Sequence, residues 1–243
     1  MLVGFVGLLA LTRWITKHVQ GIGYLLTGDG QIALVLYFLL ILPGVILHEL
    51  SHALTAFILR VRVRRFNIGI RRKGRGGQQL ALGSVEIPAS TDPFRASLIG
   101  VAPLVAGCAA ILWISSRILH LEMLPAFAGP GYWSALLAIY ETPDFWLWAY
   151  LVLAIGNSML PSAADRNAWK TTLVFAAFVG AALYFSGLLS KISVTLSSWA
   201  RASAAQLAYA FTVTVVVDLI FGVALVTVEQ LLALIGLGRV QYH

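Results

Sequence analysis

Five long apolar segments constrain the fold of this chain more than any other feature of its sequence. Each is close to or above the length of about 20 residues that an α-helix needs to cross a bilayer. The chain is 59% hydrophobic and 11% charged, whereas a typical soluble domain has about 25% charged residues. The sequence therefore predicts an all-α polytopic membrane protein with about five to six transmembrane helices. The predicted spans are Gln31–Leu59, Ala96–Leu119, Phe145–Ala163, Trp169–Leu189 and Ala204–Leu237.

The first thirty residues do not follow this pattern. Met1–Leu11 is apolar, but Arg13, Lys17 and His18 interrupt the apolar pattern before Gly21–Leu26. Charged side chains are costly at membrane depth, although long basic ones can extend to the interface. Three interpretations stay open: an interfacial helix, a sixth span or a retained signal-like segment. Of these we favour a short membrane-associated helix.

Basic residues are concentrated in one loop. Eight of the 17 Lys and Arg residues lie between Arg60 and Arg75, and an excess of Lys and Arg is typical of cytoplasmic loops. The segment from His120 to Asp144 has three acidic residues and no Lys or Arg, as expected of an external loop. We therefore expect a multi-pass protein of the cell membrane. The net charge of +7 then reflects topology and contact with the lipid bilayer, and nucleic acid is not an expected partner.

Two segments of the basic loop have the alternating pattern of β-strands. They are Arg62–Ile70 and Leu80–Ile87, and the glycine-rich segment Lys73–Gly77 between them is typical of a turn. The sequence predicts a small membrane-associated β-hairpin on the cytoplasmic side, within residues 62–87. Such a hairpin either docks on lipid headgroups or offers an open edge to an extended peptide by strand addition.

The first predicted span contains an HExxH motif, His48-Glu49-Leu50-Ser51-His52. On a helix, the i, i+4 spacing places both imidazoles on one face, where they can bind one Zn²⁺ with Glu49 beside them as general base. The alternative is a pair of structural histidines. That alternative buries two imidazoles and a carboxylate without an identified partner, at a cost of several kcal/mol for each unpaired group. The motif predicts a zinc cofactor.

A tetrahedral catalytic zinc needs a third protein ligand. Asp165 follows the third predicted span, on the same side of the membrane as the end of the HExxH helix, so the active site is expected towards the cytoplasm. Pro161 would break that span and free backbone groups to face a cavity. Asp165 is therefore the preferred third ligand, although it could instead cap a helix or pair with Arg166. Asp218 is the second choice, and Glu229 is a further rival.

The order of these motifs resembles that of the site-2 protease family of intramembrane zinc metalloproteases. Three features carry the resemblance: the HExxH motif in an early span, a basic hairpin followed by the Gly-x-x-Pro element Gly100–Pro103, and the pair Asn157 and Asp165. This pair keeps the eight-residue separation of the family's NxxPxxxxDG element. Two departures are present, because Pro161 is one position late and Arg166 replaces the glycine after the aspartate.

The resemblance covers about residues 31–170 and implies a metalloprotease core there, with an N-terminal membrane-associated segment (1–30) and C-terminal transmembrane helices (171–243). It implies a divergent member without a PDZ-like or CBS-like domain, because no soluble stretch is long enough for one. The implied activity is hydrolysis of a peptide bond within or near the transmembrane helix of a substrate protein. Asn157 would hold the substrate backbone or orient Asp165.

Two other functions stay open from the sequence. In a polytopic transporter or metal-handling membrane protein, His48, His52 and Asp218 would form a cation or proton path, but that interpretation gives no role to Glu49 or to the hairpin. A pseudoprotease would bind a membrane helix without cutting it, and Arg166 after the aspartate is compatible with this. The natural substrate and the oligomeric state are not indicated by the sequence.

Overall fold

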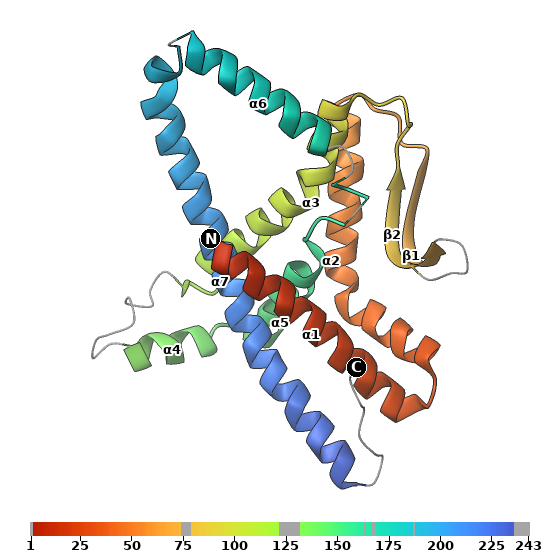
Figure 1. Cartoon of the computed structure of the whole chain (residues 1–243). Helices are drawn as coiled ribbons and strands as arrows, with labels where there is room; N and C mark the ends of the chain where they lie inside the picture. The colour runs from red at the N-terminus through yellow and green to blue at the C-terminus, as the bar shows by residue number, and fades with distance from the viewer. Residues whose placement is uncertain are drawn as a thin grey trace.

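The computed structural model describes residues 2–73, 79–121, 132–162, 164–166, 169–186 and 188–235 (Figure 1). This part of the chain is mostly helical and contains a two-stranded antiparallel sheet. The helical prediction with one hairpin is therefore confirmed, but three of the described helices, not five, are long and apolar enough to cross a membrane. They are Gly30–Ile58, Pro93–Ile118 and Ser197–Leu234.

The chain begins with two helices joined by a tight turn. Helix α1 (Leu2–Thr27) continues without a break through its charged residues, and α2 (Gly30–Ile58) follows at once. Gly28 has a φ of +70°, a left-handed conformation that favours glycine. Asp29 caps α2 by accepting a hydrogen bond of 2.6 Å from the backbone N–H of Gln31. Helix α1 is thus 26 residues long, longer than the short helix expected here.

Helix α2 lies at the centre of the fold, in contact with α1, both strands and two later helices, α3 (Pro93–Trp113) and α5 (Phe145–Ser158). Gly44 allows α5 to approach so closely that a Cβ at this position would overlap the carbonyl oxygen of Ala154. The opposite face of α2 carries exposed apolar side chains, among them Leu54 and Phe57. One face of this helix therefore packs inside the protein while the other is apolar and open.

The predicted hairpin is present beside α2, at the edge of the molecule in Figure 1. Strand β1 (Arg65–Lys73) pairs antiparallel with β2 (Gln79–Glu86), with Ile68 opposite Gly83 and an irregularity between Ile68 and Arg71. Both strands lie within the predicted residues 62–87, although β1 begins three residues later than expected. The predicted turn was Lys73–Gly77; Lys73 is the last residue of β1, and residues 74–77 lie outside the described part.

Helix α5 is shorter than the third predicted span. It ends at Ser158 after 14 residues, whereas the apolar pattern predicted a span to Ala163 with its helix broken at Pro161. Pro161 lacks a backbone N–H, and a residue that precedes a proline is driven away from helical conformation, so the chain leaves the helix before the apolar run ends. A short helix, α4 (Tyr132–Tyr140), lies in the segment expected to be an external loop. Residues 122–131 of that segment lie outside the described part.

The C-terminal helices also differ from the predicted spans. Helix α6 (Trp169–Phe185) has 17 residues, and α7 (Leu188–Leu234) has 47. Apolar length predicts the part of a helix that can cross a membrane, but it does not predict where a helix begins. Polar residues with adequate helix propensity extend α7 towards its N-terminus, so it starts 16 residues before the predicted Ala204.

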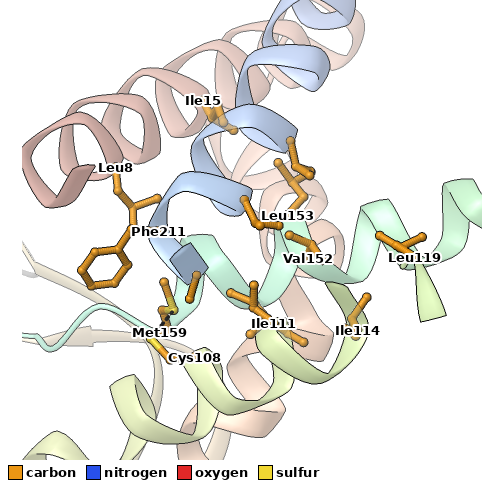
Figure 2. Packing of buried hydrophobic residues seen from close by; sticks show 14 residues of the cluster. Leu8, Ile15, Cys108, Ile111, Ile114, Leu119, Val152, Leu153, Met159 and Phe211 are labelled. Carbon is orange, nitrogen blue, oxygen red and sulfur yellow. Dashed lines mark hydrogen bonds between the residues drawn. The ribbon is translucent and has the colours of Figure 1, made fainter. Parts of the chain in front are cut away.

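The main hydrophobic core joins α1, α3, α5 and α7 (Figure 2). It continues through a π-helical turn, Ile114–Ile118, that extends α3. Glycines allow close packing here as well, because a Cβ at Gly156 of α5 would overlap the side chain of Thr214 of α7. Helix α5 is thereby held between α2 on one side and α7 on the other. Buried members of the core include Leu8, Ile15, Ile111, Val152, Leu153 and Phe211.

The close contact at Gly44 can be tested by adding one methyl group. Gly44→Ala is expected to lower the free energy of unfolding by about 1–3 kcal/mol, because the methyl group meets the α5 backbone, which cannot move aside as a side chain can. Thermal unfolding of detergent-purified protein measures the change. Gly30→Ala is the matched control, since this position of the same helix has nothing within 4 Å. Equal midpoints for the two variants would contradict the packing described.

Candidate metal centre

The structure brings His48, His52 and Asp165 together. Both histidines lie on α2, and Asp165 lies in the turn that follows α5. The two Nε2 atoms are 3.2 Å apart, and a carboxylate oxygen of Asp165 lies 3.2 Å from Nε2 of His52 and another 3.8 Å from Nε2 of His48. One possible ligand atom from each residue therefore lies within 4.8 Å of the others, and the group can hold a metal ion.

These separations match the requirements of one tetrahedral ion. Bonds of about 2.0–2.2 Å at tetrahedral angles place ligand atoms roughly 3.3–3.6 Å apart. The three observed separations, 3.2, 3.2 and 3.8 Å, differ from this range by only a few tenths of an ångström. The distances to the two histidines involve different carboxylate oxygens of Asp165, so the spacing is compatible with one ion held by both imidazoles and this carboxylate.

Each histidine is oriented by its second ring nitrogen. Nδ1 of His48 lies 2.7 Å from the carbonyl oxygen of Ser158, and Nδ1 of His52 lies 2.8 Å from the carbonyl oxygen of Ile99. A carbonyl oxygen only accepts, so both Nδ1 atoms donate and both Nε2 atoms are left as the ligating nitrogens. Two such lone pairs facing each other at 3.2 Å need a proton or a cation between them. The donor set therefore fits a metal ion.

Asp165 is held by a short turn. Its carboxylate accepts a hydrogen bond of 2.7 Å from the backbone N–H of Ser162, and its own backbone N–H lies 3.3 Å from the Ser162 hydroxyl. Burial alone would raise the pKa of the Asp165 carboxyl, but the adjacent His52 imidazole and the hydrogen bonds with Ser162 outweigh burial and hold the pKa below its usual value. The carboxyl is therefore ionised at neutral pH, the form that ligates a metal.

Gly100 of α3 makes room for this turn. A Cβ at Gly100 would overlap the carbonyl oxygen of Asp165 and lie 3.3 Å from Nε1 of Trp169. The preceding residue, Ile99, supplies the carbonyl that orients His52. Two consecutive residues of α3 therefore place one histidine and the aspartate relative to each other.

Glu49 lies beside the metal ligands in a cavity of about 760 Å³. Its side chain is buried, and strand β2 passes directly against it: a Cβ at Gly83 would overlap the Oε1 atom of Glu49. The lining combines α2, α3, the end of α5 and residues of β2, including Ser84 and Val85. The cavity volume is within the usual range of about 300–1,000 Å³ for ligand sites. The hairpin is thus a wall of this cavity.

Asn157 and the two rival ligands, Asp218 and Glu229, lie outside the metal group. Asn157 lines the cavity, but its amide nitrogen donates to the carbonyl of Leu153 and to Asp218, each at 2.9 Å. Asp218 is fully buried next to Asn157 and is not part of the metal group. Glu229 lies 3.9 Å from Nε2 of His18, away from the histidine pair. The arrangement favours Asp165 over both rivals.

Several residues of the site were not predicted from the sequence. The carbonyls of Ile99 and Ser158 leave no mark in a sequence, because every residue has one. Ser162 could have been found, since a serine three residues before an acidic residue is typical of reciprocal capping turns. The contact between Gly83 and Glu49 depends on how the hairpin folds back on α2.

No protein-family model, curated protein or solved structure matches this chain. The interpretation of the site therefore rests on its own geometry. That geometry defines a group of two histidines and one aspartate that can hold a metal ion, with a buried glutamate beside it.

The approach of α3 to the Asp165 turn predicts the effect of a methyl group at Gly100. Gly100→Ala is expected to weaken Zn²⁺ affinity about 10–100-fold, the range found when groups that orient metal ligands are disturbed. Titration of purified protein against a competing chelator measures the affinity. Gly23→Ala is the matched control, because its added methyl group also meets backbone, at 2.9 Å from Cα of Ala33, but this contact lies 15 residues before His48 on α2. Unchanged affinity in Gly100→Ala would contradict the placement of the turn.

Proposed function

We propose that this chain is a multi-pass protein of the cell membrane and an intramembrane zinc metalloprotease of the site-2 protease kind. It would hydrolyse a peptide bond within or near the transmembrane helix of a substrate protein. The observation that carries the proposal is the presence of a buried glutamate beside a histidine–histidine–aspartate metal group in one cavity. A structural metal site would not require this glutamate or the cavity.

The HExxH spacing favours zinc as the metal. Two imidazoles and one carboxylate with a fourth position open occur in catalytic zinc sites. When bound by His48, His52 and Asp165, zinc would supply Lewis acidity for attack on the scissile carbonyl. The carbonyls of Ser158 and Ile99 keep both imidazoles in the ligating tautomer, so binding requires no tautomer exchange.

Glu49 would transfer the proton. It follows His48 directly, and Glu49 lines the same cavity as the ligands, where it would take a proton from the attacking water and pass it to the leaving amide nitrogen. The contact with Gly83 of β2 restricts the positions of the Glu49 carboxylate. The carboxylate is therefore oriented by the hairpin as well as by its own helix.

The exposed side chains support a site within a membrane. The outer face of α2 carries exposed leucine and phenylalanine side chains, as expected for contact with lipid tails. Arg62, Arg64 and Arg65 are exposed where the chain leaves α2 for the hairpin, as expected at a cytoplasmic interface. His52 precedes Arg60 by eight residues, roughly 12 Å along a helix. The active site would therefore be submerged but near the cytoplasmic side.

Strand β2 is the element best placed to hold a substrate. A peptide bond inside a helix is shielded, so a segment of the substrate must unwind before it is cut. In the described sheet β2 pairs with β1 alone, and residues of β2 line the cavity next to Glu49. An extended substrate segment could add to this sheet by backbone hydrogen bonds, which require no particular sequence.

The transporter alternative has less support. It required Asp218 to join the two histidines, but Asp218 bonds Asn157 and lies outside the metal group. It also gave no role to Glu49, which the fold buries beside the ligands. The protease proposal gives a role to each of these groups except Asp218.

The decisive experiment separates metal binding from proton transfer. Wild-type protein is expected to hold about one zinc per chain and to cut single-span reporter substrates. Glu49→Gln should keep the zinc but lower the cleavage rate about 10²–10⁴-fold, because it loses only the base. Asp165→Ala should lose both. Zinc content is measured by elemental analysis and cleavage by gel assay of the same preparations.

Glu229→Gln is the matched control, because it makes the same change of a carboxylate outside the cavity. It should leave zinc content and cleavage unchanged. Full zinc occupancy in Asp165→Ala would argue for another metal site and for the transporter alternative. Zinc-loaded wild-type protein that cuts no substrate would argue for a pseudoprotease.

The contact between β2 and Glu49 predicts a graded effect at Gly83. Larger side chains should displace the Glu49 carboxylate or the strand, so cleavage should fall from wild type to Gly83→Ala and at least tenfold in Gly83→Val. Zinc content should stay the same, because the three atoms nearest an added Cβ all belong to Glu49, which is not a ligand. Cleavage and zinc content are measured together. Wild-type cleavage by Gly83→Val would show that the strand is not held against Glu49.

A further inference from the structure

A second buried polar pair lies next to the metal centre and has no role in the function proposed above. Asp218 of α7 has no exposed surface, and its Oδ1 accepts a hydrogen bond of 2.9 Å from Nδ2 of Asn157. The other oxygens of the pair, Oδ2 of Asp218 and Oδ1 of Asn157, have no hydrogen-bond partner among the described residues. Burying a carboxyl that has a hydrogen bond at only one of its oxygens is costly. Leucine at this position would therefore be expected to give a more stable fold.

The hydrogen bonds of Asn157 fix the end of α5. One N–H of its amide donates to the carbonyl of Leu153, one turn earlier on the same helix, and the other donates to Asp218 of α7. Both donors of the side chain are therefore used. The amide links the last turn of α5 to α7.

The residue after Asn157 contacts the metal centre. The carbonyl of Ser158 accepts the hydrogen bond from Nδ1 of His48, which directs the other nitrogen of this ring to the metal position. Ser158 is also the last residue of α5, where helix carbonyls lack partners within the helix. A small shift of this last turn would therefore move the acceptor that orients His48.

Close packing holds the end of α5 in place from both sides. Gly156 places the backbone of α5 against Thr214, one turn before Asp218 on α7, and Gly44 places α2 against Ala154 and the hydroxyl of Ser158. The end of α5 is thus confined between the helix that carries Asp218 and the helix that carries His48.

We propose that Asp218 is a positioning residue of the metal centre: through Asn157 it fixes the last turn of α5, and thereby the Ser158 carbonyl that orients His48. The inference rests on the zinc site of the proposed function but does not require proteolysis. It gives α7, which lies outside the region of the family resemblance, an indirect part in metal binding.

The test measures Zn²⁺ affinity and the absorption spectrum of Co²⁺-loaded protein, which reports ligand geometry. Asp218→Leu should raise the Kd for Zn²⁺ about tenfold and alter the Co²⁺ bands, while the melting temperature of the metal-free protein does not fall. Asp218→Asn should restore the Kd to within about twofold, because its carbonyl accepts the same hydrogen bond. The effect of Asp218→Leu should disappear in an Asn157→Ala background, because Asp218 acts through Asn157.

Thr214→Val is the matched control, since it removes a buried hydroxyl of α7 that bonds only within its own helix. It should leave the Kd unchanged. If Asp218→Leu does not fold, Asn157→Leu removes the same hydrogen bond from the other partner and should raise the Kd equally. Wild-type Kd and Co²⁺ bands in these variants, or additive effects at the two positions, would overturn the inference.

The outcome is distinguishable from a failure of the proposed function. Protein that binds zinc but cuts no substrate would overturn the protease and leave the role of Asp218 supported by the affinity data. Wild-type protein without affinity for Zn²⁺ would remove the metal centre and overturn this inference with it.

Discussion

The site depends above all on two hydrogen bonds from imidazole N–H groups to backbone carbonyls. Without them, the i, i+4 spacing would place His48 and His52 on one face of α2 but would fix neither the ring orientation nor the tautomer. Because the carbonyls belong to Ser158 of α5 and Ile99 of α3, each ring is oriented by a different helix. The geometry of the metal group is therefore a property of the packing of three helices.

Glycines make that packing possible. At three positions around the site a Cβ would overlap another element: Gly44 meets α5, Gly100 meets the Asp165 turn, and Gly83 meets Glu49. Each contact brings a backbone or a carboxylate close to the metal position. A larger side chain at any of them would separate elements that must lie together. Glycine in a helix or strand lowers the stability of that element, but here it allows the close contacts that the site needs.

Local spacing explains how much of the site the sequence could predict. The HExxH motif specifies its geometry within one helix, so His48, Glu49 and His52 could be assigned together. Asp165 could be placed only by matching depths across two spans, and the structure brings it to the pair. The end of α5 and the start of α7 were wrong, because apolar length does not locate helix ends. Contacts such as that of Gly83 depend on tertiary approach, which no local pattern encodes.

The distribution of polar groups shows how an apolar bundle can contain such a site. Ionisable side chains are costly within a membrane unless they are paired or bind a cation, and here the metal group, Glu49 and Asp218 all lie on inward faces while the outer face of α2 is apolar. Of the residues that follow the end of α5, Ser162, Ala164 and Asp165 line the cavity. Asp218 differs from the metal group because its partner among the described residues is the neutral amide of Asn157. Because the cost of burying this carboxyl is not offset by a cation among the described residues, we assign its role to the side chain that it bonds, Asn157, next to the metal centre.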